Sequence, residues 1–223
     1  MSNNQTSRWR RVLALPTGSR GLPQYSTQLK KTTSRGQIYL LDQFRGKVPL
    51  NGKNHIIAVL SELVGTFLFM LLGLGGTSAA ISLSRDNPVS PNKYLFIAAS
   101  WGTSAAVNGW VFFRISGGLF NPAVTIAMMA IKAVSLFRGT LIILTQITAC
   151  IAASGVLIRL VPPDSVAMTE LDKGTSVIQG LFIEMFLTAQ VVFAIFMLAT
   201  EKHKATFIAP LGIGVAVFAA VLA

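Results

Sequence analysis

The stretch Ser116-Gly117-Gly118-Leu119-Phe120-Asn121-Pro122-Ala123-Val124-Thr125 decides the fold of this chain. It lies between apolar segments of membrane length, where helix-breaking residues need other groups to satisfy their backbone, because an unpaired amide in hydrocarbon costs several kcal/mol. Asn121-Pro122 is typical of a helix N-cap followed by proline at the first helical position. The apolar run 123–134 then predicts a helix of about 12 residues, too short to span a bilayer. The stretch therefore predicts a half-helix that begins within the membrane and lines a pore.

The composition around this stretch predicts an all-α integral membrane protein. The chain is 52% hydrophobic and 12% charged, and its mean hydropathy is +0.60. A membrane helix needs about 17 or more largely apolar residues. Five segments meet that length, namely 56–83, 94–113, 139–161, 176–200 and 207–223.

The net charge of +11 would suggest a nucleic-acid partner in a soluble protein, but its placement favours a membrane explanation. Ten of the 19 Lys and Arg residues precede the first apolar segment. The positive-inside rule puts this arm in the cytoplasm, and alternation of the spans then places 15 basic residues inside and 4 outside. We expect residues 1–54 to form a largely disordered basic arm near anionic lipid, and residues 55–223 to form the membrane domain. No nucleic-acid partner is expected.

The apolar segments contain an internal repeat. Glu62-Leu63-Val64-Gly65-Thr66 in the first segment corresponds to Glu184-Met185-Phe186-Leu187-Thr188 in the fourth, and each pair places a carboxyl group and a threonine on one helix face. A unit of three spans reverses the orientation of the next unit, which predicts inverted repeats with broken helices at the midplane. Asn121 lies 59 residues after Glu62, and the same offset from Glu184 passes Ala223. We therefore expect five of six transmembrane helices and only the first half-helix.

Taken together, these residues resemble the aquaporins, or major intrinsic proteins. The resemblance covers roughly residues 56–223 and is closest to the fungal branch of the family. It rests on the signature at 116–125, Glu62-x-x-Gly65-Thr66, Gln146, Glu184-x-x-x-Thr188 and Ala209-Pro210. The resemblance implies an inverted-repeat bundle that assembles as a homotetramer, lies in the plasma membrane and passively conducts water and glycerol or other small neutral solutes. We expect no cofactor and no enzymatic activity.

The resemblance also assigns roles to individual residues. Asn121, Pro122 and Ala123 form the pore motif, in which Asn121 caps the half-helix and points an amide N–H at the permeant. The carbonyls of Gly117, Gly118, Leu119 and Phe120 form an acceptor ladder, and we expect the two glycines to let this backbone run extended. Glu62, Glu184 and Gln146 brace the re-entrant loops. The positive end of a half-helix repels cations, and two such ends meeting would discourage a proton wire.

The selectivity filter is assigned in the same way. Trp101 lies 20 positions before Asn121, where the resemblance implies a member of the outer aromatic constriction. Its wide indole suits a carbon backbone and its N–H can reach a hydroxyl, although an interfacial tryptophan is the alternative. Val221 falls at the implied filter position of the fifth span and would add an apolar wall. The second Asn-Pro-Ala and its following arginine do not occur in these 223 residues.

Two other functions remain open at this point. Glu62 and Glu184 could relay protons in a coupled transporter, since ionisable groups within a membrane are functional candidates. A non-conducting membrane protein with a structural or regulatory role is the second alternative. The two histidines and one cysteine show no metal-ligand spacing, and no nucleophile motif is present, which disfavours an enzyme.

Overall fold

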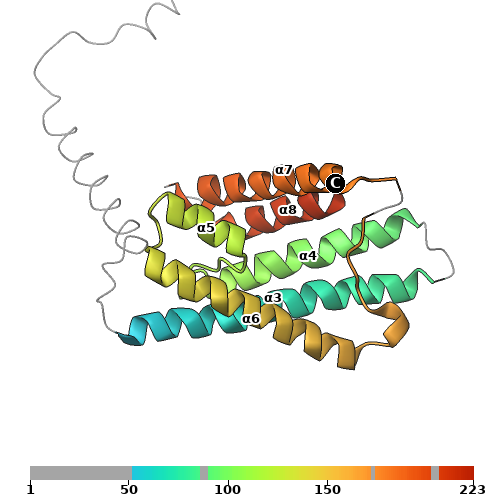
Figure 1. Cartoon of the computed structure of the whole chain (residues 1–223), viewed down its shortest axis with the longest axis horizontal. Coiled ribbons are helices and arrows are strands. Elements are labelled where there is room, and N and C mark those ends of the chain that lie inside the picture. The colour runs from blue at the N-terminus through green and yellow to red at the C-terminus, as the bar shows by residue number, and fades with distance from the viewer. Residues whose placement is uncertain (1–51, 86–89, 172–173, 202–205) are drawn as a thin grey trace, which may run out of the picture. The chain divides into compact units, whose positions relative to one another are not determined.

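The computed structural model describes residues 52–85, 90–171, 174–201 and 206–223 (Figure 1), so the predicted arm 1–54 lies almost entirely outside the described residues. The long helices are α3 (Gly52–Leu83), α4 (Pro91–Phe112), α6 (Leu136–Leu160), α7 (Val177–Ile195) and α8 (Ala209–Leu222). The half-helix is α5 (Pro122–Ala130), and short turns lie at η1 (Pro163–Ser165), η2 (Phe196–Thr200) and η3 (Thr206–Ile208). Each predicted apolar segment coincides with a helix, and the described residues contain no strand. The predicted all-α membrane fold class is confirmed.

Three described helices are long and apolar enough to cross a membrane, judged by length and composition: Asn54–Leu83, Leu136–Leu160 and Val177–Thr200. The helix α4 has 22 residues but carries polar side chains along its length, among them Thr103, Ser104 and Asn108. The helix α8 has only 14 residues. Both helices are therefore weaker as isolated membrane spans than the sequence pattern alone predicted.

The helices pack around α4 and α3. Helix α4 packs against both α3 and α8, α3 packs against α6, and α7 lies beside α8 (Figure 1). Two glycines allow α4 and α8 to approach closely, because a Cβ built on Gly102 would lie 2.7 Å from the carbonyl oxygen of Gly214. Small residues of this kind allow membrane helices to meet at backbone distance.

The half-helix α5 begins and ends with well-formed caps. Asn121 adopts an extended conformation and its side chain accepts a hydrogen bond of 2.8 Å from the Ala123 N–H. At the other end the Ala133 N–H donates to the Met128 carbonyl and the Lys132 N–H donates to the Met129 carbonyl, both at 2.9 Å. This pair of bonds is a Schellman motif, and it places Lys132 at the left-handed position with φ of 60°. The motif ends α5 four residues before the predicted boundary.

A buried apolar cluster fixes α5 against its neighbours. Met128 is 2% exposed and packs with Leu119, Val124 and Ile142, while Ile195 of α7 covers the same cluster. The half-helix α5 thus packs between α6 and α7, which fixes the position of its N-terminus in the bundle.

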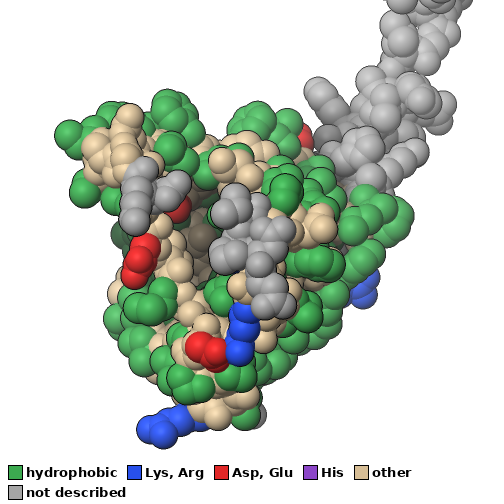
Figure 2. All heavy atoms as spheres, turned by 90° about the vertical axis from the view of Figure 1, so that its right-hand side faces the viewer, with side chains coloured by type: hydrophobic (Ala, Val, Ile, Leu, Met, Phe, Trp, Pro, Cys, Tyr) green, Lys and Arg blue, Asp and Glu red, His purple; other side chains and the backbone are tan. Residues whose placement is uncertain are grey.

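The end of the bundle opposite the Schellman motif carries charged groups. Figure 2 views this end and shows acidic and basic side chains around a hollow, with hydrophobic side chains on the flanks. Arg85, just after α3, forms an ion pair of 2.6 Å with Asp164 of η1. Charged ends and apolar flanks are the distribution that a membrane-spanning bundle requires.

Candidate functional site

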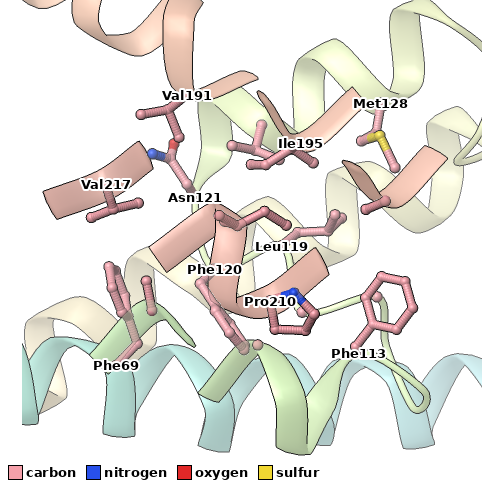
Figure 3. Close-up of a pocket in the computed structure, with 17 residues that line it drawn as sticks. Phe69, Phe113, Leu119, Phe120, Asn121, Met128, Val191, Ile195, Pro210 and Val217 are labelled. Carbon is pink, nitrogen blue, oxygen red and sulfur yellow. The ribbon is translucent and has the colours of Figure 1, made fainter. Parts of the chain in front are cut away.

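A cavity of about 80 Å³ lies between the half-helix and the long helices (Figure 3). One water needs about 10–15 Å³ of volume measured in this way, so the cavity can hold several. Its wall is made by Phe69, Ala105, Gly109, Phe113, Gly117, Gly118, Leu119, Phe120, Asn121, Val124, Met128, Val191, Ile195, Ala199, Pro210, Ile213 and Val217. Apart from the Asn121 amide and the backbone of the loop, the wall is apolar.

Asn121 supplies the polar side chain of this wall. Its Oδ1 is occupied by the Ala123 N–H, so the amide NH₂ is left to donate elsewhere. Figure 3 places the side chain beside Val191 and Val217, at the wall of the cavity. The same residue thus caps a helix and presents a donor at a positive helix end, where an oxygen atom of a solute is favoured.

The loop before Asn121 follows a left-handed path. The φ angles are 108° at Gly117, 60° at Gly118 and 50° at Phe120, so the expected extended backbone is wrong at these positions. Glycine tolerates positive φ freely, whereas Phe120 carries a Cβ and needs outside support to stay there. That support comes from Glu62, whose Oε1 accepts from the Leu119 N–H at 3.0 Å and whose Oε2 accepts from the Phe120 N–H at 3.1 Å.

Glu62 is fully buried and belongs to a larger hydrogen-bond network. Gln146 donates its side-chain amide to Glu62 Oε2 at 3.0 Å. Thr125 in turn lies within hydrogen-bond distance of both Gln146 Oε1, at 3.2 Å, and the Asn121 carbonyl, at 3.0 Å. The network links α3 and α6 to the loop and to the first turn of α5.

Two residues expected in a selectivity filter do not line this cavity. The Trp101 indole N–H donates to Thr77 Oγ1 at 3.1 Å, so it is already engaged within the protein. Val221 lies near the end of α8 and is 40% exposed. Glu184 also lies apart from the cavity: it is exposed on α7, and within the described ranges its carboxylate has no hydrogen bond or ion pair.

Sequence reasoning missed three contributors. Phe69 lines the cavity and lies seven residues after Glu62, a helical spacing that could have placed it on the same face. Thr125 belongs to the quoted signature, but its bond to Gln146 depends on tertiary packing. Thr77, the partner of Trp101, had no signal in the sequence.

Comparison with known proteins matches residues 50–223 to the family model described as major intrinsic protein. The chain belongs to this family. Among curated members, it is 50% identical over 177 residues to "Aquaporin-7" of Botryotinia fuckeliana, covering 76% of this chain and 39% of that protein. It is 50% identical over 181 residues to "Aquaporin-2" of the same fungus, covering 78% and 48%. "Aquaporin-1" of Gibberella zeae is 45% identical over 172 residues, covering 75% and 54%.

Membership of the major intrinsic protein family confirms the resemblance found in the sequence and the fungal character of its relatives. The family consists of channels, not enzymes. The chain spans 39% to 54% of the length of these three relatives. Within the described residues, no group of three or more His, Cys, Asp and Glu side chains could hold a metal ion.

Proposed function

We propose that this chain acts as a passive transmembrane channel for water and for glycerol or other small neutral solutes. The observation that carries the proposal is the capped N-terminus of α5 at the wall of the cavity. There the free Asn121 NH₂ and the adjoining loop backbone provide polar groups, and apolar side chains face them. A narrow passage with few polar groups lets a solute replace its hydration without binding so tightly that it cannot leave.

Glycerol is proposed as a solute because of the size and polarity of the cavity. A cavity of about 80 Å³ with one polar and several apolar sides suits a solute that has hydroxyls on a carbon backbone. Trp101 and Val221 are the proposed filter residues. The indole of Trp101 would offer a wide face that suits a carbon backbone, and Val221 would add an apolar wall. Glu184 is proposed to brace a second re-entrant loop, as Glu62 does for the first.

The proposed setting is a homotetramer in the plasma membrane with a cytoplasmic N-terminus. Residues 1–54 would form the basic arm near anionic lipid and residues 55–223 the channel domain. Exposed apolar residues on the outer side of α6, namely Leu144, Ile147 and Ile151, support contact with lipid or with other subunits.

Proton-coupled transport is disfavoured by the bonds of Glu62. Both of its oxygens accept hydrogen bonds from groups that cannot release a proton at neutral pH, two backbone amides and one side-chain amide. A relay would need to break this brace at every cycle. The carboxylate therefore serves the loop and not a proton path.

The proposal is tested by glycerol uptake into proteoliposomes that contain the full chain. Light scattering after a hyperosmotic glycerol step reports shrinkage by water loss and then reswelling by glycerol entry. Wild-type protein is expected to accelerate both phases relative to empty vesicles. Asn121→Asp is the matched variant, because aspartate can still accept the cap bond but has no NH₂ to donate. Equal rates in wild-type and empty vesicles would favour the non-conducting alternative.

A further inference from the structure

Met128 brings a thioether to the wall of the cavity. It belongs to the half-helix α5 and lines the cavity together with Asn121 and Ile195 (Figure 3). Only 2% of Met128 is exposed, whereas Asn121, on the same wall, is an exposed residue. The cavity is therefore the route by which a small molecule in contact with Asn121 approaches the Met128 sulfur.

A hydroxyl group lies beside this sulfur. Thr200, at the end of the π-helical turn η2, donates from Oγ1 to Met128 Sγ at 3.8 Å. Met128 otherwise packs among the apolar side chains of Leu119, Val124 and Ile142. A thioether is only a weak acceptor, so this bond contributes little in the reduced protein. It does place a donor within reach of an oxygen atom bound to the sulfur.

We propose that Met128 is a modification site at which hydrogen peroxide, a small neutral hydroperoxide, oxidises the thioether to a sulfoxide. A sulfur lone pair attacks one peroxide oxygen, and the S–O bond forms as the O–O bond breaks. The proton on the attacked oxygen passes to the departing oxygen, which leaves as water. Sulfur is oxidised by two electrons and the peroxide is reduced. The site rests on the proposed function in one respect, because the cavity must admit small neutral solutes.

The sulfoxide would change both the shape and the polarity of the wall. Oxidation turns a flexible apolar side chain into a polar one. A polar group in apolar surroundings is costly unless it is hydrogen-bonded, and the Thr200 hydroxyl can donate to the new oxygen. The added oxygen narrows the cavity and offers a passing solute a strong acceptor. We therefore expect conduction to fall when Met128 is oxidised.

Access to the site is tested with two oxidants of different size. Proteoliposomes of the full chain are treated with hydrogen peroxide or with tert-butyl hydroperoxide, and sulfoxide at each methionine is measured by peptide mass spectrometry. Met168, which is 78% exposed, is the internal reference for both reagents. Met129 is the matched control, because it is the next residue of α5 but packs on Gly139 and does not line the cavity.

We expect hydrogen peroxide to oxidise Met128 as well as Met168. With tert-butyl hydroperoxide, oxidation of Met128 relative to Met168 should fall at least about tenfold, the lower end of what a size difference achieves in a fitted site. Met129 should show no such preference. Met128 that stays reduced after hydrogen peroxide has fully oxidised Met168 would overturn the site. An equal preference at Met129 would also overturn it, because the cavity would not be the cause.

The effect on conduction is measured as water flux, with each protein compared with its own untreated sample. Hydrogen peroxide should slow flux in wild type and in Met168→Leu, whereas Met128→Leu should keep its own untreated rate. An equal loss in Met128→Leu would overturn the effect on conduction. Untreated vesicles without flux would refute the proposed channel. In that case oxidation of Met128 with the expected preference for hydrogen peroxide would still support the site, and its absence would overturn the site as well.

Discussion

Glu62→Gln removes one acceptor oxygen from a fully buried side chain that accepts three hydrogen bonds. The carboxylate accepts from Leu119, Phe120 and Gln146, and all three donors lie in buried surroundings. Glutamine has one carbonyl oxygen, so whichever way its amide is turned, at least one buried N–H loses its partner at a cost of about 1–3 kcal/mol. The remaining bonds become neutral and roughly half as strong. The total loss is about 3–5 kcal/mol.

The assay is thermal unfolding of the purified chain in detergent, combined with flux in proteoliposomes. A loss of that size lowers the midpoint by roughly 10 °C for a chain of this length. Water flux should fall as well, because Glu62 is the hydrogen-bond acceptor that the structure shows for the Phe120 N–H at this left-handed position. Glu170→Gln is the control, since it makes the same chemical change at an exposed loop position. If both variants unfold within about 1 °C of wild type, the difference lies within the ±0.5 kcal/mol of ordinary surface changes and the brace is refuted.

Three further predictions follow from local geometry. Lys132→Gly should stabilise the chain by roughly 1 kcal/mol, because glycine adopts the left-handed Schellman position without strain; a lower thermal midpoint would contradict this. Asn121→Asp should keep the midpoint near that of wild type, since the cap remains, but should reduce water and glycerol flux, and undiminished flux would show that the NH₂ donor is dispensable. Asp164→Asn breaks the ion pair with Arg85, whose side chains are 59% and 49% exposed, so it should shift stability by no more than about 1 kcal/mol and less in high salt; a large, salt-independent loss would contradict a screened surface pair.

The half-helix could be predicted from the sequence because its signals are local. Asn121 and Pro122 mark the N-terminus by their own side-chain chemistry, and the structure begins α5 at Pro122. The C-terminus of α5 was predicted beyond its actual end because no glycine follows the helix. The left-handed position of the Schellman motif is occupied by Lys132, a residue type that gives no sequence signal for a left-handed conformation. The class of the fold likewise followed from the lengths of the apolar segments.

The conformation of the loop before Asn121 and the contacts of Trp101 could not be predicted from the sequence, because they depend on contacts between segments distant in the chain. The two glycines before Leu119 suggested an extended backbone, but Gly117 and Gly118 have positive φ angles, and the N–H groups of Leu119 and Phe120 both donate to Glu62. Trp101 was predicted from its distance to Asn121, and sequence spacing cannot reveal that Thr77 takes its N–H. Residues 1–51 lie outside the described part of the chain, so the expected basic arm stays a prediction.

The most direct test of the proposed channel is the osmotic water permeability of proteoliposomes at several temperatures. In the proposed channel, water would exchange hydrogen bonds with the Asn121 amide and the loop carbonyls and so cross with little loss of hydrogen bonding. Water that dissolves in lipid first loses its hydrogen bonds. The account predicts faster shrinkage than in empty vesicles together with a lower activation energy. Permeability and activation energy equal to those of empty vesicles, from protein that is folded and inserted, would contradict it.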